Sequence, residues 1–306
     1  MALTQSEMVT VLLQEAHPGL EVRLEKIVTS GDRILDSPLA RIGDRGLFVK
    51  EIEEALLAGT IDLAVHSAKD VPTELPPGLG ILAYPEREDT ADVFVGRLSD
   101  AAQLGEGPRI VGTSSLRRRS QLLAAFPGVQ TVDIRGNVET RIRKIDELGL
   151  DGTILAAAGL RRLGRFADAA FVFPDGMMVA AVGQGSLAIE GRLQDERVRA
   201  LIAPLDHGPT RLAVTAERAL MRALEGGCQV PIGAHASLDG DELVLTAYVG
   251  SLDGSRSIRL VRRGPADFPE RLGADLAGAM RTAGADDILA DVRGGTSWVS
   301  PDPTAI

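Results

Sequence analysis

Hydrophobic residues recur along the first third of the chain in two spacings, one typical of helices and one typical of strands. Apolar positions from Leu3 to Ala16 fall near helical spacing, and Pro18-Gly19 ends that pattern. From Glu21 to Val28 apolar and polar residues alternate, which predicts a strand. Leu47 to Leu57 is again predicted as a helix, and Ile61 to Val65 as a short strand that leads into a polar loop.

The middle of the chain repeats one unit three times, in which a short apolar strand is followed by a turn and a helix. The predicted strands are Arg109 to Gly112, Val129 to Ile134 and Gly152 to Ala157. The turns are Thr113-Ser114-Ser115, Arg135-Gly136-Asn137 and Ala158-Gly159, and the helices are Leu116 to Ala125, Val138 to Leu148 and a third that begins at Leu160. Strands and helices that alternate at this pitch predict βαβ units around a parallel sheet.

The last third of the chain has a different pattern. Leu212 to Leu224 predicts a helix that ends at Gly226-Gly227. Asp239-Gly240 and Asp253-Gly254 are typical hairpin turns, and they separate strand-like runs. Because a further helix is predicted from Pro269 to Ala283, this part reads as a small antiparallel α+β module.

Composition adds limits to this picture. The chain has 306 residues, 44% of them hydrophobic but only 3% aromatic, with 34 glycines, which favours two or three α/β domains with aliphatic cores. A single cysteine excludes a disulfide framework. No signal peptide pattern and no run of about 18 apolar residues is found, so we expect a cytoplasmic protein without a membrane span.

Charge is distributed unevenly along the chain. The net charge is −10, which argues against general nucleic-acid binding. Between Arg109 and Arg165, however, 11 Lys and Arg stand against 5 Asp and Glu. Such a basic segment could attract a small anion to one place or could be a solvated helix face, and charge counting alone favours the solvated face.

The positions of the arginines change that balance. In parallel sheets the turns after the carboxyl ends of the strands gather at one edge, where ligands bind. Each of the three turns supplies arginine: Arg117 and Arg118 after the first, Arg135 and Arg141 at the second, Arg161 and Arg162 after the third. Arg117 and Arg118 lie in the first turn of a helix, which is unfavourable for the helix dipole unless an anion is bound between them. Arginine binds carboxylates through two parallel hydrogen bonds, so we favour an anion site.

Asp70 is the candidate acid, at the end of the loop that follows the strand Ile61 to Val65. A carboxylate beside Lys69 stays ionised, and it could stabilise a developing cation or move a proton in a closed site. An aspartate before Val71-Pro72 is also a common turn residue that caps the backbone, and the sequence leaves both interpretations open.

Cys228 is the candidate attachment point. It lies in a loop with Gly226-Gly227 before it and Pro231 after it, between a helix end and a strand. A lone cysteine is often a small buried hydrophobic residue, and the residues alone do not decide between that role and a nucleophile. The four histidines form no thiol-protease pattern with it, and no metal-ligand spacing is found, so we expect no metal.

Taken together, several stretches resemble the porphobilinogen deaminase (hydroxymethylbilane synthase) family. They are Arg45 to Glu51, Ala64 to Pro72, Val111 to Arg118, Arg135 to Val138, Ala158 to Gly164, Val182 to Gly185 and Glu225 to Gly233. The likeness runs in order from Leu3 to about Val292, so it covers nearly the whole chain.

The resemblance implies a transferase of tetrapyrrole biosynthesis. Such an enzyme joins four porphobilinogen molecules head to tail, loses ammonia at each step and releases hydroxymethylbilane. It works on a dipyrromethane cofactor, which the resemblance implies is held covalently by a thioether to Cys228. Porphobilinogen would be the small-molecule partner, and the family implies a cytoplasmic monomer without nucleic-acid or membrane partners.

The resemblance also implies roles for individual residues. Asp70 matches the catalytic carboxylate, which contacts pyrrole N–H groups and stabilises cationic intermediates. The matches to the side chains that bind acetate and propionate groups are Arg117, Arg118, Arg135, Arg141 and Arg162. Lesser binding positions are Ser67, Lys69, Thr113, Ser115 and Gln184.

The fold implied is α/β, with two domains like those of periplasmic binding proteins, built on parallel or mixed sheets, and a small α+β C-terminal domain. We expect domain 1 to comprise residues 1–86 and 183–205, domain 2 residues 87–182, and the cofactor-bearing domain residues 206–306.

One departure from the family pattern concerns the first residues. The family opens with a strand and a loop of the type Ile-Gly-Thr-Arg-x-Ser-x-Leu-Ala, whereas Met1 stands near the end of that motif. We therefore expect domain 1 to lack its first strand together with an active-site arginine and serine. Such a loss would weaken both the domain and its binding of anions, so the activity of this chain is in question, and the codons upstream of Met1 would decide the matter.

Two other functions are compatible with parts of the pattern. A non-enzymatic two-lobed protein could bind a carboxylate ligand, but it would need neither Cys228 in its glycine loop nor the third module. A nucleic-acid binder could use Arg117-Arg118-Arg119, which the net charge and the scarcity of aromatic residues disfavour.

Overall fold

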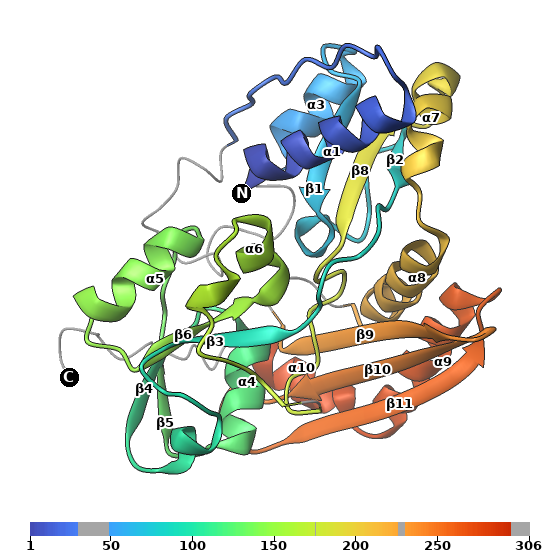
Figure 1. Ribbon diagram of the computed structural model, residues 1–306. Helices are drawn as coiled ribbons and strands as arrows, with labels where there is room; N and C mark the ends of the chain where they lie inside the picture. Colours follow the sequence, from blue (N-terminus) through green and yellow to red (C-terminus); the bar gives the residue numbers. More distant parts are fainter. Residues whose placement is uncertain (30–48, 175, 226–229, 295–306) are drawn as a thin grey trace.

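The computed structural model describes residues 1–29, 49–174, 176–225 and 230–294, and its strands form three separate sheets (Figure 1). The strand orders are β1-β8-β2, β5-β4-β6-β3-β7 and β11-β10-β9. They are called here the N-terminal, middle and C-terminal sheets. Within the described ranges, no helix is both long enough and apolar enough to span a bilayer.

The N-terminal sheet is covered on both faces. Its strands are β1 (Leu63–Ser67), β2 (Leu79–Ala83) and β8 (Leu187–Arg192), and its helices are α1 (Ala2–Ala16), α3 (Lys50–Leu57), α7 (Glu196–Ile202) and the short turn η5 (Ala203–Leu205). Leu13 of α1 packs on Ile189 of β8, while Leu56 of α3 packs on Ala64 of β1. Because side chains alternate between the two faces of a strand, the two helices lie on opposite faces.

The middle sheet contains the three predicted strand–helix units. Its strands are β3 (Asp92–Gly96), β4 (Arg109–Gly112), β5 (Val129–Val132), β6 (Gly152–Ala156) and β7 (Phe171–Val172). Its helices are α4 (Leu116–Ala125), α5 (Val138–Glu147) and α6 (Ala157–Arg162), with the short turns η3 (Ala102–Gly105) and η4 (Phe166–Asp168). β4 is parallel to β5 and to β6, as predicted, but β3 is antiparallel to β6 and β7, so the sheet is mixed.

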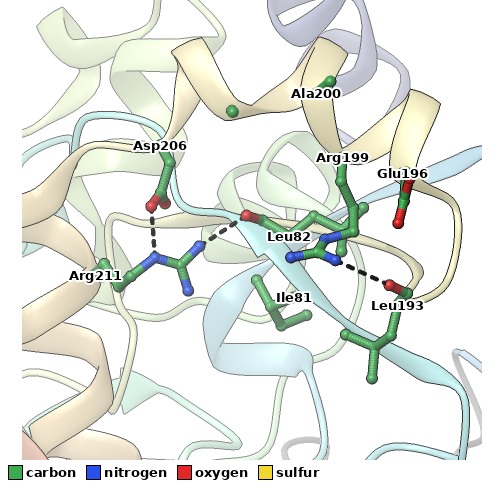
Figure 2. Close-up of a pocket in the computed structure, with 9 residues that line it drawn as sticks. Ile81, Leu82, Leu193, Glu196, Arg199, Ala200, Asp206 and Arg211 are labelled. Atoms are coloured by element: carbon green, nitrogen blue, oxygen red, sulfur yellow. Dashed lines mark hydrogen bonds and ion pairs between the residues drawn. The ribbon is translucent and has the colours of Figure 1, made fainter.

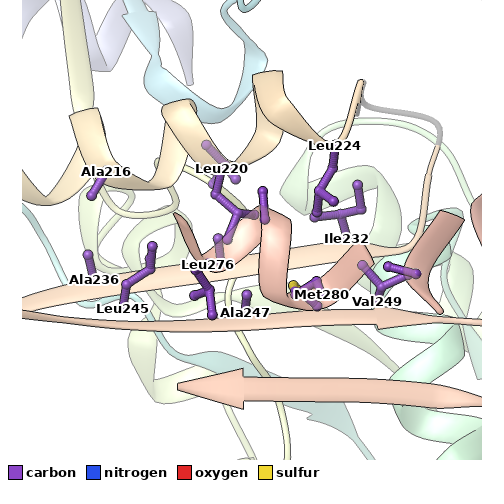
Figure 3. Close-up of a cluster of buried hydrophobic side chains, with 14 of the residues drawn as sticks. Ala216, Leu220, Leu224, Ile232, Ala236, Leu245, Ala247, Val249, Leu276 and Met280 are labelled. Carbon is purple, nitrogen blue, oxygen red and sulfur yellow. The ribbon is translucent and has the colours of Figure 1, made fainter. Parts of the chain in front are cut away.

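The C-terminal sheet is an antiparallel meander with helices on one face. It consists of β9 (Ile232–Asp239), β10 (Glu242–Gly250) and β11 (Ser257–Pro265), with α8 (Gly208–Ala223), α9 (Pro269–Thr282) and α10 (Ala285–Arg293). Leu220 of α8, Leu245 of β10 and Leu276 of α9 meet in its core (Figure 3). The predicted fold class, α/β with a small α+β C-terminal part, is confirmed.

Several local predictions differ from the structure, among them the following three. Residues Glu21 to Val28 belong to no strand, because alternation favours an extended backbone but a strand also needs a hydrogen-bonded neighbour. The turn expected at Ala158-Gly159 lies inside α6, which begins directly after β6. The strand expected at Ile61 to Val65 begins two residues later and continues to Ser67.

Two crossover segments join the N-terminal and middle sheets: residues 84–91, between β2 and β3, and residues 173–186, between β7 and β8. They lie side by side, since the Glu88 amide donates to the Gly185 carbonyl at 3.1 Å. Gly185 has φ +86°, and a Cβ there would lie 2.3 Å from the Glu88 oxygen. Only glycine combines that backbone conformation with so close an approach.

Candidate active site

Asp70 ends the short helical turn η2 (Ala68–Asp70), which follows β1 directly. The Ala68 amide at its start donates to the Ser186 carbonyl at 3.0 Å, and Gly183, with φ +70°, lies against the backbone of Ala68 and Lys69. The second crossover segment therefore fixes the start of the loop. The Asp70 side chain itself is exposed to solvent.

Lys69 lies close to charges of the middle sheet as well as to its neighbour Asp70. Burial lowers the pKa of the Lys69 ammonium, Asp70 opposes that shift, and the positive charges of Arg118 and Arg141 add to it. Ser67, at the end of β1, accepts a hydrogen bond from Gln5 Nε2 at 2.8 Å. Lys69 therefore lies within electrostatic range of arginines that come from a different sheet.

The hydroxyl groups of the first strand–helix turn hold the backbone of α4. Ser115 Oγ accepts a hydrogen bond from the Arg118 amide as the N-cap of the helix. Thr113 is buried, and its Oγ1 accepts from the Ser115 amide at 3.2 Å. In this structure both predicted binding residues make structural hydrogen bonds.

The anion between Arg117 and Arg118 is a side chain of the protein itself, Asp92. Arg117 Nη1 donates to Asp92 Oδ2 at 2.6 Å, and Arg118 donates through Nε and Nη2 to Asp92 Oδ1 at 3.1 and 2.8 Å. Burial alone would raise the pKa of the Asp92 carboxyl, but the two guanidinium groups outweigh it and hold that pKa well below its usual range. An anion therefore lies between these arginines, as their position in the helix predicts, but it is a carboxylate of the protein itself.

Gln184 connects this buried ion cluster to the second crossover segment. Its Nε2 donates to Asp92 Oδ1 at 2.9 Å and to the Thr90 carbonyl at 2.7 Å, and its Oε1 accepts from Arg117 Nη2 at 3.3 Å. This side chain therefore links both crossover segments to α4.

Replacing Asp92 by asparagine should destabilise the protein by roughly 3–5 kcal/mol, because two buried guanidinium groups would lose their counter-charge. Urea unfolding monitored by circular dichroism measures the loss. The folded state depresses the pKa of Asp92, so its contribution is fully present above the unfolded value of about 4 and is lost as the pH falls through the lower folded value. The gap between the two proteins should therefore persist from neutral pH to about pH 4 and shrink in stronger acid.

Asp146 offers a matched control for this substitution. It pairs with Arg97 at 2.9 Å at the surface, so Asp146→Asn should cost less than about 1 kcal/mol. Equal losses for the two variants would contradict the assignment of Asp92 as the counter-charge of the arginine pair.

Arg141 and Arg135 come from the second turn and from α5. Arg141 Nε donates to the Gly136 carbonyl at 2.8 Å. Burial lowers the pKa of Arg141 to about 10; Arg118 and Arg135 add to that shift, while Asp70 opposes it. The structure therefore brings Asp70 of one sheet and three arginines of another into one electrostatic environment.

Arg162 at the end of α6 contacts the second crossover segment, since its Nη2 donates to the Gly185 carbonyl at 2.6 Å. Over the described part of the chain, the buried Nε atoms of Arg162 and Arg117 have no acceptor. Unpaired buried donors are costly, and a carboxylate oxygen would satisfy them. Arg161 is already engaged by Asp89 at 3.2 Å and by the ring of Phe166.

Two residues that the sequence did not single out hold the surroundings of the site. They are Asp92 and Glu217, a buried residue of α8 that accepts from Arg87 at 2.7 Å, from the Gly183 amide at 2.7 Å and from the Ala236 amide at 2.8 Å. For Asp92 the available signal was an acidic residue directly before the apolar run Val93-Phe94-Val95, whereas Glu217 lies between Ala216 and Arg218 without such a signal. Buried acids require partners, but the sequence does not show which.

Cys228 lies outside the described residues, as do Arg45 to Phe48 of the first matching motif. On the near side of Cys228 the carbonyls of Leu224 and Glu225 accept hydrogen bonds from Arg293 Nη2 at 3.0 and 2.9 Å. The backbone of Leu224 and Glu225, directly after α8, is thereby held in place.

A pocket of about 630 Å³ lies beside β2 and α7 and holds none of the predicted site residues (Figure 2). Its Arg211 already donates to Asp206 Oδ2 at 2.6 Å and to the Leu82 carbonyl at 2.8 Å. The charges gathered around Asp70 lie elsewhere.

Comparison with known proteins gives matches over most of the chain. Residues 1–200 match the model of the porphobilinogen deaminase dipyromethane cofactor binding domain, and residues 211–282 match that of the porphobilinogen deaminase C-terminal domain. Porphobilinogen deaminase from Geobacter metallireducens is 53% identical over 293 residues, which are 95% of this chain and 92% of the relative. The protein of that name from Geobacter sulfurreducens is 52% identical over 293 residues, again 95% of this chain and 92% of the relative.

Similar solved structures are more distant. Immunogenic lipoprotein A from Vibrio vulnificus is 14% identical, with a TM-score of 0.41 over 70% of this chain and 94% of that one. A TRAP periplasmic solute binding protein from Ralstonia eutropha H16 is 10% identical, with a TM-score of 0.39. The match covers 95% of this chain and 92% of that one.

Proposed function

The chain belongs to the porphobilinogen deaminase family, and from that premise we propose that its cluster of Asp70 and arginines is the active site of a hydroxymethylbilane synthase. The enzyme joins four porphobilinogen molecules head to tail, with loss of ammonia, into hydroxymethylbilane for tetrapyrrole biosynthesis. The observation that carries the assignment of the site is the convergence of Asp70 and Lys69 with Arg118, Arg135 and Arg141 from a second sheet.

The residues of this cluster fit the dipyrromethane cofactor of the family. The cofactor bears acetate and propionate groups, and the buried Nε atoms of Arg117 and Arg162 are donors without an acceptor within the described residues. The positive charges of Arg118 and Arg135 help to lower the pKa of Arg141, and a bound carboxylate would oppose that shift. When bound through Cys228, the cofactor supplies a pyrrole primer that is extended by substrate units.

Individual residues take separate tasks in this proposal. The carboxylates of cofactor and substrate are bound by Arg117, Arg118, Arg135, Arg141 and Arg162, with Lys69, Ser67, Thr113, Ser115 and Gln184 at lesser positions. Each Arg118 nitrogen already donates to a protein oxygen, so Arg118 acts through its charge and its fixed orientation. Asp70 is the exposed carboxylate among these cations. It stabilises positive charge that develops on the reacting pyrrole, and it accepts a hydrogen bond from the pyrrole N–H group.

Three domains accompany this function in the proposal. Domain 1 comprises residues 1–86 and 183–205, domain 2 residues 87–182 and the cofactor-bearing domain residues 206–306, each around one of the three sheets. We also propose that the protein acts as a cytoplasmic monomer with porphobilinogen as its small-molecule partner.

Arg141→Gln should raise the KM for porphobilinogen by roughly tenfold or more, because a charge-assisted hydrogen bond to a carboxylate contributes about 1.5–3 kcal/mol. Steady-state kinetics of ammonia release measure the change. Arg143, two residues later, points to solvent and pairs with Glu147 at 2.8 Å, so Arg143→Gln is the matched control and should leave KM unchanged. A KM for Arg141→Gln equal to that of the control would remove Arg141 from the binding site.

The proposed function is tested by incubating the purified chain with porphobilinogen alone. The expected result is hydroxymethylbilane together with four equivalents of ammonia. Porphobilinogen that binds but is returned unchanged would contradict the proposal and would favour a two-lobed binding protein.

A further inference from the structure

Helix α8 lies between the N-terminal and C-terminal sheets and packs on both (Figure 1). On one side Ala216 and Leu220 belong to the core of the C-terminal sheet. On the other, Val214 is fully buried in a cluster with Ala68 and Val71, which flank Lys69 and Asp70. The loop that carries the proposed catalytic carboxylate therefore rests on a helix of a different part of the protein.

Arg218, one helical turn after Val214, makes the polar contact of that face. Its Nη1 donates to the Val71 carbonyl at 3.1 Å and its Nη2 to the Pro72 carbonyl at 2.5 Å. These are the carbonyls of the two residues that follow Asp70. Burial lowers the pKa of Arg218, so the guanidinium is held in a partly dry site where hydrogen bonds are stronger than in water.

The planar guanidinium of Arg218 is suited to binding two carbonyls at once, because its two terminal nitrogens are held rigidly in one fork. Two carbonyls bound to one fork cannot rotate independently, and this fixes the backbone on the C-terminal side of Asp70. The N-terminal side is fixed separately, since the Ala68 amide binds the Ser186 carbonyl at 3.0 Å. A short turn held at both ends presents its side chain in a defined direction.

We propose that Arg218 is a positioning residue that aligns Asp70 from the C-terminal part of the chain. The inference rests on the proposed function, in which Asp70 is the catalytic carboxylate. The same helix leads to Leu224 and Glu225, whose carbonyls Arg293 holds on the near side of Cys228. A single helix thereby links the contact of Arg218 with the Asp70 loop to Leu224 and Glu225, which precede Cys228 in the sequence.

Steady-state kinetics with porphobilinogen on the full chain test this assignment. Arg218→Gln should lower kcat by roughly 10- to 100-fold with little change in KM, because a small misplacement of a catalytic group costs rate rather than binding. Arg218→Lys should recover part of that loss, since one ammonium can hold a carbonyl but cannot reproduce the fork. Arg222, one turn further along α8, is exposed, and Arg222→Gln is the matched control with unchanged kcat.

A double-mutant cycle separates positioning from a merely structural role. In Asp70→Glu the carboxylate is already displaced, so adding Arg218→Gln should lower kcat far less than it does in the unchanged chain. If Arg218→Gln lowers kcat by the same factor in the unchanged chain and in Asp70→Glu, the assignment is overturned while the proposed function stands. An unchanged kcat in Arg218→Gln would have the same consequence. No turnover by the unchanged chain would overturn the proposed function and this inference with it. Where Arg218→Gln does not fold, the same cycle with Arg218→Lys decides.

Discussion

Replacing Cys228 by serine should give a protein of unmodified mass that forms no hydroxymethylbilane. The thiolate is a far better nucleophile than a serine hydroxyl near neutral pH, so the thioether to dipyrromethane would not form. Without a covalent primer, the arginine cluster has no anchored chain to extend. Intact-mass measurement and an assay with porphobilinogen read the two effects separately.

The unchanged chain provides the reference for this prediction. Its mass should exceed the 32.3 kDa of the polypeptide by one dipyrromethane unit. An active preparation with the mass of the bare polypeptide would remove Cys228 from the proposal. Turnover by Cys228→Ser equal to that of the unchanged chain would do the same.

Replacing Asp70 by asparagine should lower kcat by about 10²–10⁴-fold while the fold is retained. Asparagine has the shape of aspartate but no charge, so it cannot stabilise positive charge on the reacting pyrrole. Asp70 is exposed and does not belong to the hydrophobic core. The circular dichroism spectrum and the unfolding midpoint should therefore stay close to those of the unchanged chain. Single-turnover kinetics on the cofactor-loaded protein measure the rate.

Asp62 supplies the matched control. It lies directly before β1, whereas Asp70 lies shortly after that strand. Its carboxylate pairs with Arg192 and Arg197 at 3.2 Å at the surface, away from the arginine cluster. Asp62→Asn should therefore leave kcat unchanged. Normal turnover in Asp70→Asn would remove Asp70 from the mechanism.

The sequence predicted the middle sheet best, because each of its strand–helix units is formed by residues close together in the chain. The helix Leu116 to Ala125 was predicted with the bounds that the structure shows, and Ser115 caps it as a hydroxyl at that position should. The strand expected at Glu21 to Val28 failed for the opposite reason. Its pattern describes one chain segment, whereas pairing depends on another segment far away.

The arginines of the site also show that a local sequence pattern does not reveal contacts with distant parts of the chain. Their spacing predicted an anion beside Arg117 and Arg118, and the anion is present, but it is Asp92 of β3. No local pattern connects a carboxylate to guanidinium groups some 25 residues away, because that contact is made by the packing of α4 against the sheet. Arg135 and Arg141 were placed correctly at one edge, since the parallel order of β4 and β5 follows from the units themselves.

The pairing of the N-terminal sheet has a consequence for how the chain reaches its native state. Among the described strands, β1 and β2 pair only with β8, which lies between them in space and follows them by more than a hundred residues. His66 and Glu190, joined across this sheet at 2.9 Å, are 124 residues apart in the chain. During synthesis the ribosome must therefore deliver β8 before the sheet can close, while the local units of the middle sheet can already form. Nascent β1 and β2 have exposed edges during that interval, and a pause before residue 187 would prolong it.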